Sequence, residues 1–451
     1  MIKFHVWLLF LNICYATGDP LLLTKFIKRG KIDEGQNAAK VTHPLFLGID
    51  SYSGYFTVNE FYKSHIFFWY IPTEHDQNAP LLLWFSGGLG QSSLVDLFLQ
   101  IGPYVPSSPE YLSLRDHSLH KHVNLLIMDA PVGVGFSTSS QINEESVNNV
   151  RDYYEALSQF YKLFPSLVTR DLYIAGESFG SQSMIKLGSL IQTQNNEIIL
   201  KHKKDRSDYD TINLKGFIFL RGIFDIRKQM NFADYWFQMG IIDTAQKSIL
   251  EQEQYKMLEF IDSGKYKLAY HKLSDIILGS KEITPFNTHF ENFTGSTEIV
   301  NNPEYENRTH INNMIIFLNR DDIQNALHTA NVSFLEFSPD VKNILLSSAT
   351  ISSTELLMEL LPDYKFLSIN TQLDPLTPAV FMDGYWNSFN ISQLKNYSTT
   401  KKEFLAINDE FVGHYKNVEK LWQVFVRHDV DKQLFWQHEI VYKFINDYSF
   451  I

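Results

Sequence analysis

The sequence predicts a mostly parallel α/β sheet with an inserted helical cap. Short apolar runs alternate with segments of helical periodicity from about residue 44 to 219, which is typical of a parallel sheet covered by helices on both faces. The segment 226–345 is more charged and richer in helical patterns, and strand patterns return after it. We therefore expect a core in two parts, 19–225 and 346–451, around a cap at 226–345. The alternative, a simple C-terminal helical domain, is disfavoured because the strand patterns resume.

The pattern of apolar residues places the individual elements. Thr57–Val58 and His65–Ile71 are expected to form antiparallel strands, and 147–164 carries apolar residues at helical spacing. Continuous apolar runs of four to eight residues predict buried strands. Those expected to be parallel are Leu81–Phe85, Asn124–Met128 and Leu172–Ala175, and further strands are expected at Phe217–Leu220, Lys365–Asn370 and Leu421–Arg427.

Composition narrows the class of protein. The chain has 451 residues, with 39 basic and 51 acidic side chains and a formal charge of −12, so we expect no nucleic-acid partner. Apolar residues make up 44% and include 35 Phe, 23 Tyr and 7 Trp. This is enough material for a large core, and it excludes global disorder.

The N-terminus is typical of a secreted protein. Lys3, an apolar run and the small residues Ala16 and Gly18 predict a signal peptide over residues 1–18, with a buried first helix as the alternative. The one cysteine, Cys14, lies inside that segment, so the mature chain would have neither disulfides nor thiolate chemistry. No later run is long enough to span a membrane. We expect secretion, or a secretory-pathway or lysosome-like compartment.

Five glycosylation acceptors support that location. Each is an asparagine in an N-x-S/T triplet, and all lie in the second half of the chain. They are Asn292, Asn307, Asn331, Asn390 and Asn396.

A candidate nucleophile follows the third parallel strand. Ser178 is the centre of the pentapeptide GESFG, which stands between a buried strand and a helical segment. In this context the glycines permit a strained turn that exposes a serine hydroxyl, the nucleophile elbow. The alternative is a tight turn with a structural serine.

The partners of such a serine follow in the chain order acid, then histidine. Asp374 comes just after the strand KFLSIN and is the candidate acid, with turn stabilisation before Pro375 as the alternative. His414, His428 and His438 are the histidines beyond it. We expect His428 to be the base because it directly follows the last strand, although an ordinary surface histidine is the competing interpretation.

A glycine-rich loop could complete the site. Residues 84–90, WFSGGLG, join a strand to a turn, and backbone amides there could face a developing oxyanion together with the Phe179 N–H. By itself the loop could equally be a plain glycine turn.

These residues resemble the serine carboxypeptidase family, and within it the vitellogenic-like carboxypeptidases. The similar blocks cover nearly the whole mature chain and include SGYFTVNE, PLLLWFSGGLGQSSLVDLFLQIGPY, NLLIMDAPVGVGFSTSS, DLYIAGESFG and FLSINTQLDP. The resemblance implies an α/β-hydrolase fold with a helical cap and removal of C-terminal residues from peptides or proteins, without a cofactor or metal. It implies these roles: Ser178 as nucleophile, Asp374 as acid, Gly88 and Phe179 as oxyanion amides, and Trp84, Gly87 and Glu177 at the substrate carboxylate.

The chain also departs from the family pattern. Ser86 stands where the family has asparagine, and Gln100 stands where it has a second glutamate. Leu89 and Gln91 replace the family's proline and small residue or cysteine. The family's catalytic histidine aligns with Asp431, three residues after His428. A carboxylate with an ordinary pKa near 4 accepts a proton from serine poorly at neutral pH.

Three functions are therefore open. The first is a carboxypeptidase that acts through an acyl-Ser178 intermediate with His428 as an irregular base. The second is a degenerate homologue that binds peptides or partners without turnover. The third is an esterase or acyltransferase, because acyl-enzyme chemistry needs only a different acceptor. The sequence gives no indication of oligomeric state.

Overall fold

One large sheet forms the centre of the computed structural model, which describes residues 19–73, 76, 78–201, 211–279, 286–297, 308–389, 392–427 and 432–447. Its strands are β1 (Tyr52–Asn59), β2 (Ser64–Ile71), β3 (Leu81–Phe85), β6 (Asn124–Met128), β7 (Leu172–Glu177), β8 (Leu214–Leu220), β9 (Lys365–Thr371), β10 (Glu403–Ile407), β11 (Glu410–Val418) and β12 (Leu421–Val426). A separate small pair consists of β4 (Tyr104–Val105) and β5 (Ser113–Leu114).

The order of strands confirms the predicted mostly parallel sheet. Across the sheet the order is β1-β2-β6-β3-β7-β8-β9-β12-β11-β10. The six strands from β6 to β12 run parallel, whereas β1, β2, β11 and β10 add antiparallel pairs at the two edges. The expected strands at Leu81–Phe85 and Asn124–Met128 have the predicted bounds, and the antiparallel pair near residues 57 and 65 is confirmed as β1 and β2.

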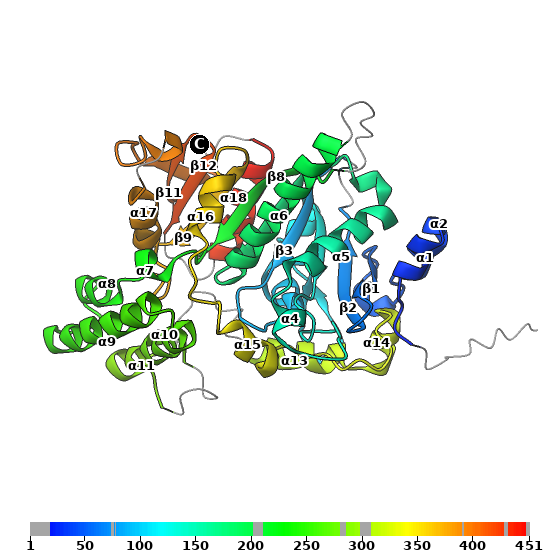
Figure 1. Ribbon diagram of the computed structural model, residues 1–451, viewed down its shortest axis with the longest axis horizontal. Coiled ribbons are helices and arrows are strands. Elements are labelled where there is room, and N and C mark those ends of the chain that lie inside the picture. Colours follow the sequence, from blue (N-terminus) through cyan, green and yellow to red (C-terminus); the bar gives the residue numbers. More distant parts are fainter. Residues whose placement is uncertain are drawn as a thin grey trace, which may run out of the picture.

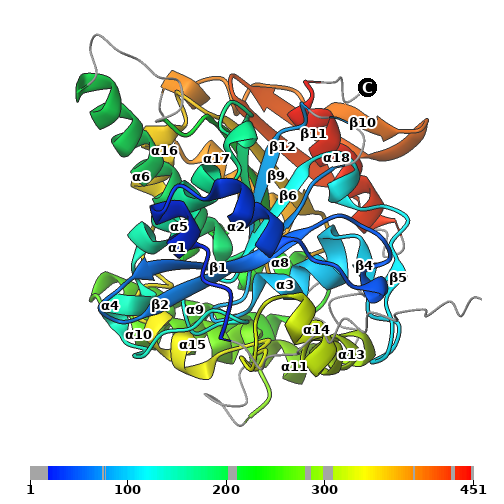
Figure 2. The ribbon, with the colours of Figure 1, turned by 90° about the vertical axis from the view of Figure 1, so that its right-hand side faces the viewer.

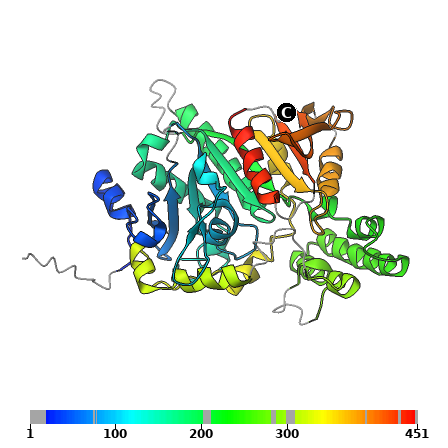
Figure 3. The ribbon, with the colours of Figure 1, turned by 180° about the vertical axis from the view of Figure 1, so that it is seen from behind.

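Helices cover both faces of the sheet (Figures 1 and 3). In the described part of the chain, six α-helices precede β8: α1 (Thr24–Lys28), α2 (Ile32–Ala39), α3 (Ser93–Asp96), α4 (Glu144–Val147), α5 (Val150–Leu163) and α6 (Gly180–Lys201). Near the C-terminus they are α16 (Thr354–Leu360), α17 (Ala379–Asn387) and α18 (Gln433–Ile445). The helices α5, α6, α16 and α17 pack on one face and α18 packs on the other.

The side chains of β3 show why its sequence is continuously apolar. Leu82 and Trp84 belong to the buried cluster that includes α18, whereas Leu81, Leu83 and Phe85 belong to the cluster under α5 and α6. A strand that is buried on both faces has no solvent side, so alternation with polar residues is absent.

The predicted helix near 147–164 begins three residues later, at Val150. The side chain of Asn149 accepts a hydrogen bond from the Arg151 N–H, and this N-cap fixes the start. The preceding residues form the separate short helix α4, which has its own capping box at Asn143.

Between β8 and α16 the described residues form further helices. They are α7 (Ile226–Gln229), α8 (Phe232–Gln238), α9 (Thr244–Asp262), α10 (Tyr266–Leu273), α11 (His289–Thr294), α13 (Arg308–Leu318), α14 (Asp321–Ala326) and α15 (Pro339–Leu345). Figure 1 shows α8 to α11 grouped beyond the edge of the sheet, and they share a buried cluster around Trp236 and Leu273. The boundaries 226 and 345 for a separate cap stay a prediction.

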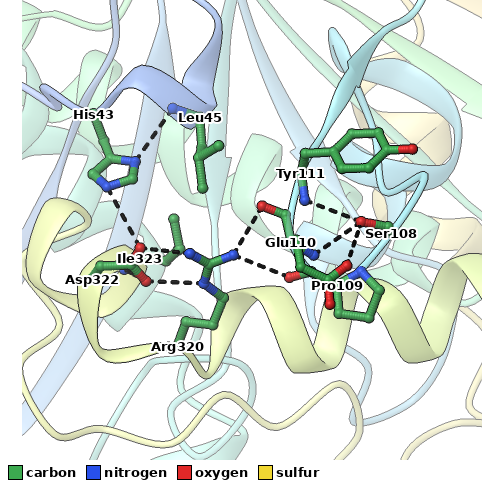
Figure 4. A network of polar contacts seen from close by, with 9 residues as sticks. All are labelled: His43, Leu45, Ser108, Pro109, Glu110, Tyr111, Arg320, Asp322 and Ile323. Atoms are coloured by element: carbon green, nitrogen blue, oxygen red, sulfur yellow. Dashed lines mark hydrogen bonds and ion pairs between the residues drawn. The ribbon is translucent and has the colours of Figure 1, made fainter.

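The first residues described lie along the β1 edge of the sheet, where Figure 2 shows α1 and α2. A polar network joins this region to α14 and to the loop at 108–111 (Figure 4). Arg320 holds Asp322 through two hydrogen bonds and donates two more to the carbonyls of Pro109 and Glu110, while His43 lies 3.7 Å from Asp322. Three segments distant in sequence are thereby tied together.

Candidate active site

Ser178 occupies a sharp turn between β7 and α6. Its φ is +47°, in the left-handed region that a residue with a Cβ rarely adopts. The Ser178 N–H donates to the Leu220 carbonyl at 3.0 Å, and its own carbonyl accepts from the Ile223 N–H at 3.1 Å. The end of β8 and the turn that follows it therefore hold the strained backbone in place.

The two glycines of the pentapeptide lie against the end of β3. A Cβ at Gly176 would come within 2.5 Å of the Phe85 carbonyl oxygen, and one at Gly180 within 2.3 Å of the Ser86 carbonyl oxygen. Both distances are shorter than real contacts allow. Close approach of two backbones is therefore why these positions are glycine.

The glycine-rich loop after β3 lies beside Ser178. A Cβ built on Gly87 would be 3.0 Å from the Ser178 Cβ, and one on Gly88 would be 2.4 Å from Oε1 of Gln91. The structure thus brings Gly87, Gly88 and Phe179 to the neighbourhood of Ser178. The oxyanion roles of the Gly88 and Phe179 amides stay a prediction.

Glu177 is held by two partners inside the protein. One carboxylate oxygen accepts a hydrogen bond from Nη2 of Arg221, and the other accepts from Nε2 of Gln100 at 2.9 Å. The side chain of Glu177 is 7% exposed and that of Arg221 is 5% exposed. Glu177 and Gln100 therefore meet as the resemblance implied, but with an arginine as a third member.

Asp374 lies close to the same arginine. Its Oδ1 accepts from the N–H groups of Leu376 at 2.8 Å and Thr377 at 2.6 Å, and its Oδ2 lies 3.8 Å from Nη1 of Arg221. Burial raises the pKa of Asp374 above 3.8, while Arg221 and the two backbone N–H groups oppose that rise. Within the described residues Oδ2 accepts no hydrogen bond.

Two other predicted site residues have partners within the protein, and their roles toward a ligand stay predictions. Trp84 is buried and its indole N–H donates to Asp96 at 2.6 Å, so this N–H does not point at a ligand. The Ser86 N–H donates to Ser93 at 3.2 Å, whereas the buried Ser86 hydroxyl has no hydrogen-bond partner in the described part of the chain.

The predicted base falls outside the described residues, as does Asp431. His414 lies on β11 and its ring packs against Phe404 and Phe411. His438 lies in α18, where burial lowers its pKa to about 3. Among the described contacts neither touches Ser178 or Asp374, and the role of His428 stays a prediction.

Arg221 was not predicted as a site residue. It follows the strand Leu214–Leu220 directly, at the same sheet edge as Ser178 and Asp374, and its φ is +54°. A charged residue placed at the carboxyl end of a buried parallel strand was the available signal, because ligands bind outside these ends in open α/β sheets.

The remaining expectations concern metals, membranes and glycans. In the described ranges, no group of three or more His, Cys, Asp and Glu is placed to hold a metal ion. The helices within those ranges are too short or too polar to cross a bilayer. Asn292, Asn331 and Asn396 are exposed, whereas Asn307 and Asn390 lie outside the described residues.

Comparison with known proteins identifies the family of the chain. The sequence model of the family described as "Serine carboxypeptidase" matches residues 41–431. The chain is 31% identical to the venom serine carboxypeptidase of Apis mellifera over 422 residues, covering 91% of this chain and 86% of that one. It is 25% identical to the vitellogenic carboxypeptidase of Aedes aegypti over 461 residues, covering 95% and 94%.

A solved structure shares the fold. It is that of Kex1(delta)p, described as a prohormone-processing carboxypeptidase from Saccharomyces cerevisiae, and the TM-score is 0.71. The match covers 91% of this chain and 96% of that one at 19% identity. The likeness shows the α/β-hydrolase fold that the resemblance implied.

Proposed function

The chain belongs to the serine carboxypeptidase family, and we propose that it binds the C-terminal ends of peptides or proteins at the Ser178 site without efficient turnover. One observation carries this proposal: Arg221 lies between Glu177 and Asp374, so that the candidate acid of the triad faces a guanidinium. The family membership supplies the class of ligand. The Arg221 contacts are what distinguish this proposal from ordinary carboxypeptidase activity.

The residue at the position of the catalytic base is the second argument for weak turnover. Asp431 stands at the family's histidine position, and a carboxylate there would add a further negative charge near Asp374. Loss of a triad histidine lowers kcat by about six orders of magnitude, leaving only the contributions of binding and the oxyanion amides.

The test combines an activity probe with hydrolysis of blocked dipeptides. Wild-type protein should label with a fluorophosphonate no faster than Ser178→Ala, and it should release little free amino acid. Asp431→His should gain Ser178-dependent labelling and hydrolysis. Rapid labelling and hydrolysis by the wild type, both lost in Ser178→Ala, would reject the proposal.

A second candidate is carboxypeptidase activity with His428 as base. It is favoured by the retained strain at Ser178 and by the buried Asp374 Oδ2, which accepts no hydrogen bond among the described residues. In this mechanism His428 accepts the Ser178 proton as Oγ attacks the peptide carbonyl, and Asp374 Oδ2 accepts the imidazole N–H. The Gly88 and Phe179 amides stabilise the oxyanion. Wild-type hydrolysis that disappears in His428→Ala, while Asp431→Asn retains it, would establish this function.

The location and the cap belong to the same proposal. We infer a secreted glycoprotein, cleaved after residue 18, whose helices at 226–345 cover the Ser178 site. The exposure of Asn292, Asn331 and Asn396 supports glycosylation at these positions. Expression in insect cells should deliver the protein to the medium, and removal of N-glycans should lower its apparent mass.

A further inference from the structure

A groove runs along α5 and shares no lining residue with the Ser178 site described above. The helix α1 and the end of β1 lie on one side of α5, and α6 lies on the other (Figure 1). The volume of the groove is about 820 Å³, within the range of about 300–1,000 Å³ that is usual for small-molecule sites. It is therefore a separate candidate for a binding site.

The floor of the groove carries a carboxylate with an unused acceptor. Asp152 and Gln159, both on α5, are the most deeply buried of the lining residues, at 6% and 4% exposed. Oδ1 of Asp152 accepts from Nδ2 of Asn149 at 2.9 Å, whereas Oδ2 accepts no hydrogen bond from the described residues. A buried acceptor without a donor is unfavourable, so a ligand N–H at this oxygen would be stabilising.

A second carboxylate stands one turn further along α5 and is more open. Glu155 follows Asp152 by three residues, which places the two side chains on one helix face with their Cβ atoms about 5–6 Å apart. Oε1 of Glu155 accepts from Nε2 of Gln159 at 2.9 Å. Gln159 is itself held by the Thr24 hydroxyl at 2.6 Å and by the Thr57 carbonyl at 2.8 Å. Residues of α1 and β1 therefore orient Glu155 toward the groove before any ligand binds.

The other charges around the groove do not compensate these two acids. They belong to Lys28, Glu60, Arg151, Lys162 and Glu197. Lys28 forms an ion pair with Glu60 at 2.8 Å. Among the described residues, neither of the exposed cations Arg151 and Lys162 pairs with the two acids. Burial and the charge of Glu155 raise the pKa of Asp152 to about 6, and no cation opposes that rise. Asp152 is therefore ionised at pH 7.5, and a cationic ligand would supply the missing charge.

We propose that this groove binds a guanidinium group carried on an alkyl stem, with the cation held by Asp152 and Glu155. A guanidinium presents several N–H donors in one plane and is weakly hydrated, so it can serve two carboxylates at once. Ile27, Val58 and Leu190 provide apolar wall for the methylene groups of the stem. The same chemistry occurs in an arginine side chain of a protein segment and in a free guanidino compound.

The experiment is calorimetric titration of the whole protein at pH 7.5 with butylguanidinium and with butylurea, the neutral compound of the same shape. Butylguanidinium should bind at least about 10-fold more tightly, because only it carries a charge. Asp152→Asn and Glu155→Gln keep the shape of the side chains and should each weaken its binding about 10-fold. Glu259→Gln is the control, since this exposed acid lies on α9 at the far side of the molecule, and it should change nothing (Figure 1). Absence of saturable binding, equal affinity for the two compounds, or unchanged affinity in either groove variant would overturn the inference.

Protonation of Asp152 provides an independent test. As pH falls from 7.5 to 5, through the pKa of about 6, Asp152 gains a proton and loses its charge. Wild-type affinity for butylguanidinium should therefore fall about 5- to 10-fold, and that of Asp152→Asn should fall by about 2-fold at most. The other charged groups of the groove are common to both proteins, so the difference isolates Asp152. Equal pH dependence of the two proteins would overturn its assignment as a ligand-binding group.

A blocked Gly-Arg-Gly peptide distinguishes the two sources of the guanidinium. Tighter binding of this peptide than of butylguanidinium would support the site and assign it to an arginine of a protein segment. Equal or weaker binding of the peptide would support the site and assign it to a free guanidino compound.

Discussion

Arg221 and Asp374 form a buried ion pair in which Nη1 lies 3.8 Å from Oδ2. The two side chains are 5% and 1% exposed, so water contributes little to either charge. The same guanidinium also binds Glu177. One arginine therefore compensates both acids beside Ser178, and its removal would leave two buried carboxylates with no cation in the described part of the chain.

Removal of that cation should destabilise the fold in a pH-dependent way. Burial already raises the pKa of Asp374 above 3.8, so the folded state binds more protons than the unfolded state above that pH. Stability therefore falls as pH rises through this window. In Arg221→Met the pKa of Asp374 should rise further and extend the window upward. We expect a loss of about 3–5 kcal/mol at pH 7.5, and a smaller loss at pH 5, by urea unfolding.

The matched control is the double variant Arg221→Met/Asp374→Asn. It carries one buried acid fewer, so the difference between its stabilities at pH 5 and pH 7.5 should be smaller than in Arg221→Met. Equal losses at both pH values in the single variant would show that Arg221 acts through packing rather than through charge.

The glycines of the elbow should tolerate no side chain. Gly180→Ala would place a Cβ 2.3 Å from the Ser86 carbonyl oxygen, and relief requires movement of the β3 end or the elbow. We expect a loss of about 1–3 kcal/mol, measured as unfolding free energy. Gly384→Ala is the control, because this helical glycine has no atom within 4 Å of its Cβ position, and it should gain about 0.5–1 kcal/mol. Equal effects would contradict the close-approach argument.

Strong apolar runs made the central sheet predictable. Leu81–Phe85 and Asn124–Met128 were placed to the residue because burial on both faces leaves a continuous signal between turns. The hairpin β10–β11 was missed because its strands are only partly buried, with Phe404 and Phe411 exposed. The sequence feature that could have predicted this hairpin is its two-residue turn, Asn408 and Asp409, because both residue types are favoured at the positive φ that they adopt.

The candidate site was predictable where a motif met a strand end. Ser178 and Asp374 follow buried strands, and the structure places both beside Arg221. Arg221 belongs to no sequence motif, because its two partners, Glu177 and Asp374, are distant from it in the sequence. The turn of the Trp84 indole toward Asp96 was likewise unpredictable, because a short helix supplies its partner.

The Arg320–Asp322 pair should add a small, acid-sensitive contribution to stability. Hydrogen bonding to Arg320 lowers the pKa of Asp322 below 3.8. A carboxylate with a lowered folded pKa stabilises above its unfolded pKa, and the gain is lost as pH falls through the folded pKa. Asp322 is 44% exposed, so Arg320→Gln should lose only about 0.2–1 kcal/mol at pH 7. Urea titrations at pH 7 and pH 2.5 should show this loss only at the higher pH. A loss that persists at pH 2.5 would instead assign the stabilisation to the carbonyl contacts of Arg320.

Gln100→Glu should make the binding of free-acid peptides depend on pH. The Gln100 amide donates to Glu177 at 2.9 Å and does not titrate, so position 100 should add no pH dependence to wild-type affinity between pH 5 and 7.5. A glutamate at the same place would bring two carboxylates together, and like charges so close share a proton rather than both ionise. At pH 5 that proton offers a donor to a terminal carboxylate, and at pH 7.5 it is lost. The variant should therefore bind the free acid about 10-fold more tightly at pH 5 than at pH 7.5.

Calorimetric titration at both pH values checks this, with Gln100→Met as the non-titrating control. Any titration of Asp374 contributes to all three proteins, so the difference between them isolates position 100. A flat profile in Gln100→Glu would mean that this position does not contact the ligand.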